Sequence, residues 1–178
     1  MKPIIILFLS GILFLSCSNS KEKNQENTKK EDNKAIVYTN PTEYNNAIVK
    51  LQSLIFESVD KLDMAINNYE PAEMDNAVME AKINIEAAIQ ELKKIGPFKE
   101  NSEYLNAAKL FFETHKELVN NEYSSLVELY KLPEEEFGEE ENAIVDSLDN
   151  SISTKQDSSF RKFWKIQVQF GKQYLLAE

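Results

Sequence analysis

The chain has 178 residues, with 30 acidic and 20 basic side chains, one His, one Cys and four Gly. A single His excludes a multi-histidine metal centre, and a single Cys excludes an internal disulfide or a four-thiolate cluster. The four Gly are scattered and form no phosphate-binding loop. The net charge of −10 argues against nucleic acid as a partner. The length suffices for one domain with its own core.

The chain begins with a pattern typical of secretion. Lys2 precedes an almost wholly apolar run from Ile4 to Leu15. This run is shorter than the roughly 20 residues that a membrane-spanning helix needs, and it has the order of a signal peptide. Phe14-Leu15-Ser16-Cys17 resembles a bacterial lipobox, with Phe14 where Leu is usual. The resemblance implies that residues 1–16 are removed and that Cys17 carries acyl chains that anchor the protein. The alternative is a soluble secreted protein with one unpaired Cys.

A polar segment follows the predicted lipidation site. Residues 18–34 contain no aliphatic or aromatic side chain, so they cannot bury enough apolar surface to offset the entropy of ordering. We predict that residues 17–40 form the acylated Cys and a flexible tether, of which residues 18–34 as a coil span on the order of 20–25 Å. Ser18 is not the Asp that usually retains lipoproteins in an inner membrane. This favours the outer membrane, with the cell surface left open as a destination.

From Pro41 onward, apolar residues recur every three or four positions, as in amphipathic helices. The spacing predicts a first helix from Pro41 to Tyr69 and a second from Glu70 to Ile95. Asn40 supplies an N-cap before Pro41, and Gly96-Pro97 ends the second helix. The predicted core positions of these helices are Tyr44, Ile48, Leu51, Ile55, Val59, Leu62, Ile66 and Tyr69, then Met74, Val78, Ala81, Ile85, Ala88, Leu92 and Ile95.

A third helix is predicted from about Ser102 to Leu132, followed by an exposed connection with six Glu in residues 134–141. The last arm contains a polar stretch, Ser151 to Ser159, which suggests a break. We expect a short helix over 142–149 and a main helix over 153–176. Its predicted core residues are Phe160, Phe163, Trp164, Phe170, Tyr174 and Leu175. Residues 41–178 are therefore predicted to form an all-α, up-down-up-down four-helix bundle.

Two segments resemble a family of uncharacterised bacterial proteins. The segment Tyr44-Asn45-Asn46-Ala47-Ile48-Val49-Lys50-Leu51-Gln52 resembles the first helix of the LIC-type surface lipoproteins. The segment Gln167-Val168-Gln169-Phe170-Gly171-Lys172 is similar to their last helix. The resemblance covers residues 41–178 and implies a lipid-anchored helical bundle. It implies no activity and no site residues.

His115 is the candidate ligand-binding residue, because it shares a helical face with core positions. Helical bundles can hold haem through a His and a Met, and Met64, Met74 and Met79 are available. The alternative is a half-buried His that is hydrogen-bonded to a neighbour such as Glu122. A di-metal carboxylate site needs Glu-x-x-His on two helices, and position 112 is Phe. The sequence therefore predicts no metal and no cofactor.

Other chemistry finds little support. Ser124-Ser125 lie about 15 Å along the helix from His115, so no triad forms, and we predict that the protein is not an enzyme. The acidic segment 134–141 lacks the ligand spacing of an EF-hand and suits a solvated connection. The segment Phe160 to Lys165 combines aromatic and basic residues. We expect its rings in the core, the alternative being a patch that touches headgroups or an acidic partner.

Two functional hypotheses follow. The first is a non-enzymatic envelope lipoprotein that binds an unknown protein through an exposed apolar patch. The second is a small-ligand carrier for haem or a hydrophobic molecule, with an internal pocket lined by residues such as Phe111, His115, Leu118 and Phe163.

Overall fold

The structure, a computed structural model, describes residues 35–175, and the structural statements below concern this part of the chain. The predicted signal peptide and Cys17 lie outside it. The five α-helices that it contains form four arms: α1 Pro41–Asn68, α2 Pro71–Lys93, α3 Glu103–Leu118, α4 Ser124–Tyr130 and α5 Glu139–Phe170. A π-helical turn, Val119–Tyr123, joins α3 to α4 in one arm, and another, Gly171–Leu175, follows α5. A short 3-10 turn, Glu134–Glu136, lies in the connection before α5.

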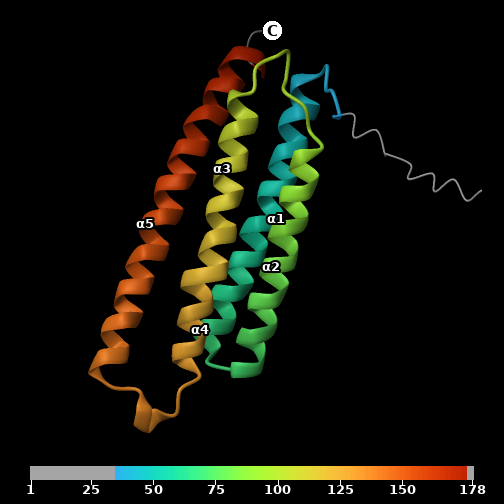
Figure 1. Cartoon of the computed structure of the whole chain (residues 1–178). Coiled ribbons are helices and arrows are strands. Elements are labelled where there is room, and N and C mark those ends of the chain that lie inside the picture. The colour runs from blue at the N-terminus through green and yellow to red at the C-terminus, as the bar shows by residue number, and fades with distance from the viewer. Residues whose placement is uncertain (1–34, 176–178) are drawn as a thin grey trace, which may run out of the picture. The chain divides into compact units, whose positions relative to one another are not determined.

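The four arms run alternately up and down, which confirms the predicted all-α four-helix bundle (Figure 1). α1 packs along α2, α3 packs along α5, and α2 contacts α3. Short links join arms that are neighbours in space, as is typical of antiparallel bundles. Each helix buries one apolar stripe in the common core, and this packing supplies most of the helical stability.

The helix ends carry the caps that the sequence suggests. Asn40 Oδ1 accepts hydrogen bonds from the backbone N–H groups of Thr42 (2.8 Å) and Glu43 (3.2 Å), which would otherwise lack partners. Tyr69 ends α1 in the left-handed conformation with a φ of 55°. It is therefore a C-cap that is 64% exposed, and its predicted core position is wrong. Pro71 begins α2 directly afterwards.

The third arm is interrupted where the sequence predicts a continuous helix. In the π-helical turn, the Ser124 hydroxyl donates to the carbonyl of Val119, five residues earlier, at 2.7 Å. A π-helical turn contains more residues than an α-helical one, so it shifts the phase of every later position. Glu122 therefore leaves the face of His115 and contacts Ser151 of α5, whose hydroxyl donates to it at 3.0 Å.

α5 is one continuous helix from Glu139 to Phe170, so the predicted break in the last arm is wrong. The polar stretch stays helical because it has partners on the neighbouring arm. Ser151 and Lys155 both bind the Glu122 carboxylate. The buried face also continues through this stretch, where three of the buried positions are seven residues apart: Val145, Ile152 and Ser159.

Aromatic rings fill the core at one end of the bundle, which we call the aromatic end. Phe170 lies at its centre, with ring centroids 4.9–5.5 Å from those of its four neighbours, Tyr44, Phe98, Tyr104 and Tyr174. The amide of Gln167 donates to the Tyr104 hydroxyl at 2.9 Å, so a polar atom in this apolar region has a partner. The rings join α1, α3, α5 and the loop after α2.

The chain reaches α1 along the same end. The Ile36 N–H donates to the Lys94 carbonyl at 2.7 Å, and its carbonyl accepts from the Gly96 N–H at 2.9 Å. A Cβ at Gly96 would lie only 3.3 Å from that carbonyl oxygen, so the close approach suits a glycine. Tyr38 packs edge-on against Tyr44. Residues 36–38, which fall within the predicted tether, thus contact the bundle.

Two of the aromatic residues predicted for the core of the last arm are exposed instead. Phe163 and Phe170 are buried, as predicted, but Phe160 is 37% exposed and Trp164 is 53% exposed. Each step along a helix turns the side chain by about 100°. Since Phe163 faces the centre of the core, Trp164 is rotated out of it. The Trp164 ring stacks on Phe160 with centroids 6.1 Å apart.

Candidate functional site: a cleft between α1, α3 and α5

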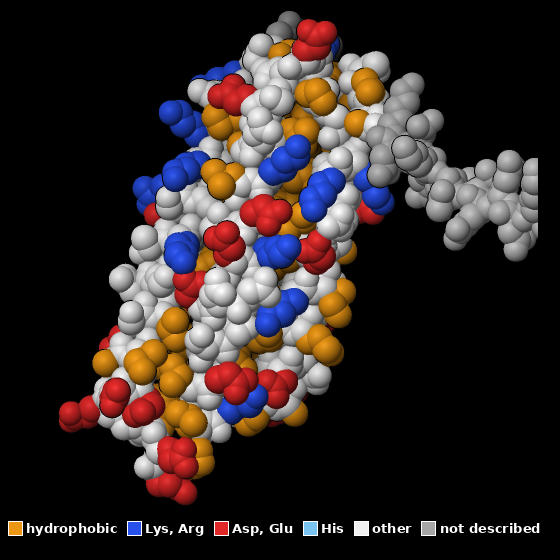
Figure 2. Space-filling view, viewed as in Figure 1, with side chains coloured by type: hydrophobic (Ala, Val, Ile, Leu, Met, Phe, Trp, Pro, Cys, Tyr) orange, Lys and Arg blue, Asp and Glu red, His pale blue; other side chains and the backbone are white. Residues whose placement is uncertain are grey.

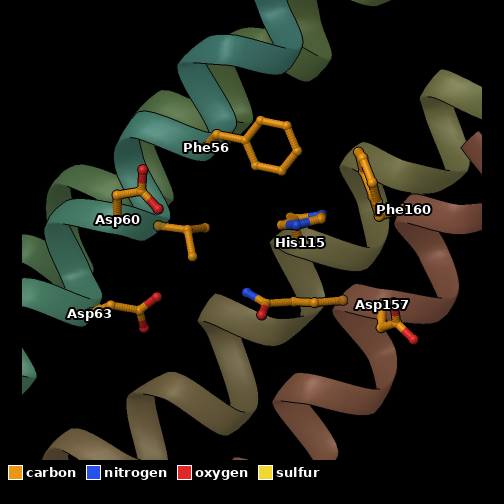
Figure 3. Close-up of a pocket in the computed structure, with 8 residues that line it drawn as sticks. Phe56, Asp60, Asp63, His115, Asp157 and Phe160 are labelled. Carbon is orange, nitrogen blue, oxygen red and sulfur yellow. The ribbon is translucent and has the colours of Figure 1, made fainter. Parts of the chain in front are cut away.

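The seam between α1 and α5 is the most open of the four seams between neighbouring arms. Each of these helices packs closely on another partner, and their backbones scarcely approach each other. A cleft of about 360 Å³ opens there, with α3 beneath it (Figure 3). Eight residues line it: Phe56, Val59, Asp60, Asp63, His115, Gln156, Asp157 and Phe160.

His115 lies in the cleft next to the paired rings of Phe56 and Phe160 (Figure 3). Only 2% of the residue is exposed, so it is fully buried where the sequence suggested a half-buried side chain. Its ring packs on Phe111 with centroids 4.3 Å apart. Its position follows from the helical repeat, since Phe111 and His115 are one turn apart on the buried face of α3.

The hydrogen bonding of His115 fixes its tautomer. Nδ1 lies 2.9 Å from the Phe111 carbonyl oxygen, which can only accept, so Nδ1 carries the proton. The predicted bond to Glu122 is wrong, because the π-helical turn moves that residue to another face. Nε2 is then an acceptor, and no protein group within residues 35–175 bonds to it. It is not among the buried polar atoms without a partner, which are the Tyr44 hydroxyl and one carboxylate oxygen of Glu122, so Nε2 is open to solvent from the cleft. Burial lowers the pKa of His115, so the imidazole is neutral at pH 7.

Two carboxylates of α1, Asp60 and Asp63, line the side of the cleft across from the imidazole (Figure 3). Asp63 is hydrogen-bonded to the Tyr123 hydroxyl, which also accepts a hydrogen bond from Gln156 at 3.1 Å. Burial, and the nearby charge of Asp60, raise the pKa of Asp63. In the described part of the chain neither carboxylate has an ion-pair partner, and no Lys or Arg lines the cleft.

The third carboxylate of the lining is already neutralised. Asp157 accepts a hydrogen bond from Arg161 Nε at 2.8 Å, one turn along α5. In Figure 3 its side chain points away from His115. The uncompensated negative charge of the cleft is therefore that of the α1 side, whereas α5 contributes an apolar wall and the Gln156 amide.

Aromatic rings form the apolar part of the cleft. The rings of Phe56 on α1 and Phe160 on α5 meet edge to face with centroids 6.0 Å apart. Phe56 is also edge-on to the His115 ring at 6.3 Å. The cleft thus combines ring faces, a neutral nitrogen acceptor and two unpaired carboxylates within one small volume.

The arrangement does not suit a metal or a His–Met haem site. Among the described residues, no three His, Cys, Asp or Glu side chains come together closely enough to hold a metal ion. No Met lines the cleft. Of the three considered from sequence, Met74 is buried at the start of α2, while Met64 and Met79 are exposed.

The other candidate groups lie elsewhere. Ser124, which the sequence considered as a nucleophile, donates its hydrogen bond to the Val119 carbonyl and does not reach the cleft. The six-Glu segment 134–141 is largely exposed, as predicted. The residues expected to form a pocket around His115 do not line the cleft, because all three pack in the core: Phe111, Leu118 and Phe163.

Sequence analysis found His115 but missed the α1 side of the site. Phe56, Asp60 and Asp63 follow one another at steps of four and three, so they share one helical face beside the buried stripe. That pattern was available in the sequence. The sequence did not indicate which arm this face of α1 would meet. Only the packing of α1 against α3 brings the face to His115.

Comparison of the chain with protein-family models, with curated proteins and with solved structures finds no match. The resemblance to surface lipoproteins therefore stays a prediction. Within residues 35–175, no helix combines the length and apolar character needed to cross a bilayer. The function is accordingly argued from the site.

Proposed function

We propose that the protein is a lipid-anchored, non-enzymatic binding protein of the cell envelope that takes a small amphipathic cation into the α1–α3–α5 cleft. The observation that carries the proposal is His115, a buried neutral imidazole whose Nε2 lacks a protein partner and faces the cleft. Because no protein group occupies this acceptor, a ligand that donates a hydrogen bond can pair with it in the cleft.

The charge of the cleft selects a cation. Asp60 and Asp63 repel each other, and in the described structure no basic side chain offsets them. An ammonium group beside these carboxylates reduces their repulsion, while Nε2 of His115 is available to accept a hydrogen bond from a donor elsewhere on the ligand. At an effective dielectric constant typical of protein surfaces, such a contact is worth up to about 4 kcal/mol at 4 Å before desolvation is counted.

The rings of Phe56 and Phe160 favour a ligand with an apolar portion. Their faces also attract cations, which adds about 0.5–1 kcal/mol at partly exposed sites. Because no three acidic or His side chains converge on one point, an organic cation suits this site better than a metal ion. An aryl or alkyl ammonium has both required features.

The contents of the cleft support a role in binding without catalysis. Its lining contains no Ser, Thr, Cys or Lys that could serve as a nucleophile beside His115. The lipobox at Phe14 to Cys17 supports the anchor, as does the resemblance of residues 41–178 to surface lipoproteins. Mass spectrometry of the mature protein tests the anchor: we expect a chain that begins at an acylated Cys17, and an unmodified Cys17 contradicts it.

A matched pair of probes tests the cleft: phenethylammonium and its neutral counterpart 2-phenylethanol. His115 is the only His of the chain, so its imidazole ¹⁵N resonances report directly on Nε2. We expect phenethylammonium to shift the Nε2 resonance in a saturable manner and 2-phenylethanol to bind more weakly. If neither probe binds, the cleft is not a ligand site. If both bind equally, charge does not select the ligand.

Variants assign the recognition to the carboxylates. Asp60→Asn removes one charge at an exposed position, so folding is preserved, and we expect about a fivefold loss of affinity, which corresponds to roughly 1 kcal/mol. The matched control is Asp146→Asn, which removes the same charge from an exposed position of α5 that does not line the cleft. Equal losses in both variants indicate a long-range effect of net charge and contradict the proposed contact.

A protein partner is the second candidate function, and the outer face of α2 favours it. Met79 and Ile83 lie one turn apart and are 57% and 61% exposed. Paired apolar side chains on one exposed face are a feature of interaction surfaces. A photo-crosslinking residue at Ile83, used in the native membrane, tests this hypothesis against the same residue at Lys82. A product specific to position 83 that is lost in Met79→Glu supports a partner there.

A further inference from the structure

The last arm of the bundle is divided by charge. From Glu134 to Asp157 it contains nine acidic residues and one cation, Lys155. Residues 158–175 contain no Asp or Glu and four cations: Arg161, Lys162, Lys165 and Lys172. Figure 2 shows Lys and Arg gathered toward the aromatic end of α5 and Asp and Glu at the opposite end of the bundle. A positive region thus exists on a chain with a net charge of −10.

Most of these cations are not neutralised by the protein itself. Arg161 pairs with Asp157 through a side chain that is 76% exposed. In the described residues, Lys162, Lys165 and Lys172 form no ion pair, and all three are exposed. Their charge is therefore available to an external partner. Unpaired Lys also occur elsewhere on the described bundle, so what distinguishes residues 158–175 is the absence of any Asp or Glu among them.

The helix dipole does not explain why the cations of the last arm are separated from its acidic residues. Cations stabilise the C-terminal turn of a helix, but the effect falls off within that turn. Arg161, Lys162 and Lys165 lie five to nine residues before the end of α5 at Phe170. These three cations therefore need a different physical reason.

An exposed Trp lies among the cations. Trp164 is 53% exposed, and Phe160, on which it stacks, is 37% exposed. An indole has a broad apolar face and one N–H donor, so it is stable where apolar and aqueous media meet. On α5, Arg161 and Lys165 lie within about 100° of Trp164, whereas Lys162 is turned about 160° away from it, toward the groove with α3. Trp and cations together on one helix face are typical of helices that lie at the surface of anionic membranes.

The position of this surface agrees with a membrane partner. It adjoins the aromatic end, where Ile36 joins the bundle through the loop after α2. The predicted acylation site, Cys17, is 19 residues before Ile36 in the sequence. The predicted anchor is thus joined to the bundle through the chain that enters at the aromatic end.

We propose that residues 158–175 bind an anionic lipid surface, with Lys165 and Lys172 at the phosphates and Trp164 at the level of the headgroups. The proposal rests on the lipid anchor only for its proximity to the membrane, and it is independent of the cleft ligand. The acidic segment 134–141, at the other end of α5, is repelled by the same surface. The bilayer thus orients the bundle as well as retaining it.

The single Trp of the chain provides the measurement. The acylated protein is reconstituted into vesicles of phosphatidylcholine alone, or with one third of the lipid replaced by phosphatidylglycerol. The anchor predicts association with both vesicles. The lipid-binding surface predicts that Trp164 emission moves to shorter wavelength, and that brominated lipid quenches it at least twofold, only when phosphatidylglycerol is present. Raising the salt concentration should reverse both signals, because surface charges are screened.

A charge-matched pair of variants locates the effect. Each surface cation contributes about fivefold to binding of an anionic membrane, so Lys165→Gln with Lys172→Gln should lower the ratio of docked to undocked protein about thirtyfold. Lys61→Gln with Lys82→Gln removes the same charge from α1 and α2 and should leave the ratio unchanged. All four positions are exposed, so the variants keep the fold.

The outcomes separate the two proposals. Association without any response of Trp164 to phosphatidylglycerol keeps the anchor and overturns the lipid-binding surface. Equal effects of the two double variants also overturn it, because net charge alone then explains the binding. Failure of the protein to associate with phosphatidylcholine vesicles contradicts the anchor, while a shift of Trp164 with phosphatidylglycerol vesicles still supports the surface. A Trp164 shift that an acidic peptide produces and anionic vesicles do not would assign the surface to a protein partner and overturn the lipid proposal.

Discussion

At the aromatic end, α1, α3 and α5 meet through rings that fill the space between them; along the cleft the same three helices meet through carboxylates, an amide and a single imidazole. At the aromatic end Gln167 bonds to Tyr104, and the Tyr44 hydroxyl is buried without a partner. At the cleft, Nε2 of His115 lacks a protein partner in the described chain but is open to solvent. Close packing provides stability but leaves no room for a ligand. The difference separates a region that stabilises the fold from the region of the proposed binding site.

The largest expected effect comes from opening the aromatic end. Phe170→Ala removes a ring that is 5% exposed and contacts four aromatic neighbours, so it should cost about 3–5 kcal/mol of unfolding free energy. Phe160→Ala removes the same atoms at the cleft, where the ring is 37% exposed, and should cost less than half as much. Urea denaturation of both variants measures the contrast. Similar losses would show that the cleft is part of the stabilising core.

The polar contacts beneath the cleft should give the next largest effect. The Tyr123 hydroxyl bonds to Asp63 and accepts from Gln156. Tyr123→Phe keeps the ring but leaves a partly buried carboxylate without this donor, which should cost about 1.5–3 kcal/mol. The pKa of Asp63 should rise further, because a hydrogen bond that favours its charged form is lost. Denaturation and an NMR titration of the Asp63 carboxyl measure the two effects, and an unchanged pKa would show that the bond does not form in solution.

His115 should make the stability of the protein depend on pH. Its pKa is lowered by burial in the folded state, so below about pH 6.5 the unfolded chain binds a proton that the folded chain does not. The free energy of unfolding should therefore fall as the pH drops from 6.5 to the lowered pKa, and should level off below it. Asp63, whose pKa is raised, contributes with the opposite sign.

The comparison of wild type with His115→Phe isolates the contribution of His115. The variant keeps an aromatic ring on α3 and removes the titration, so its melting temperature should change less between pH 7 and pH 5.5 than that of the wild type. If the two proteins lose stability in parallel, the imidazole is charged in the folded state, and the neutral acceptor in the cleft is contradicted.

The sequence predicted core residues of the aromatic end but did not predict the residues that form the cleft, for a physical reason. Periodic apolar positions define which face of each helix is buried, so Tyr44, Phe163 and Phe170 were predicted as core residues and are buried. The π-helical turn at Val119–Tyr123 has no such signal. By changing the phase of its helix it moved Glu122 from the predicted His115 contact to α5.

The cleft depended on contacts between arms. Asp60 and Asp63 lie on α1 and His115 on α3, and no local pattern indicates their distance in space. The continuous α5 was missed for a similar reason, since the polar stretch from Ser151 is held by Glu122 of the neighbouring arm. Local periodicity thus predicted the buried faces of single helices, while the site arose from polar side chains at the edges of those faces.

The smallest expected effect concerns an ion pair far from both regions and serves as their common reference. Lys61 on α1 and Glu80 on α2 pair at 2.6 Å, with side chains that are 61% and 51% exposed. Exposed pairs contribute about 0.2–1 kcal/mol, because solvent screens them and ordering two long side chains costs entropy. A double-mutant cycle with Lys61→Gln and Glu80→Gln should give a coupling energy of about 0.5 kcal/mol or less, and neither variant should alter binding of phenethylammonium. A coupling energy as large as the stability loss in Phe170→Ala would show that the α1–α2 surface is a main source of stability. The contrast between a stabilising aromatic end and the proposed binding cleft would then not account for the stability of the protein.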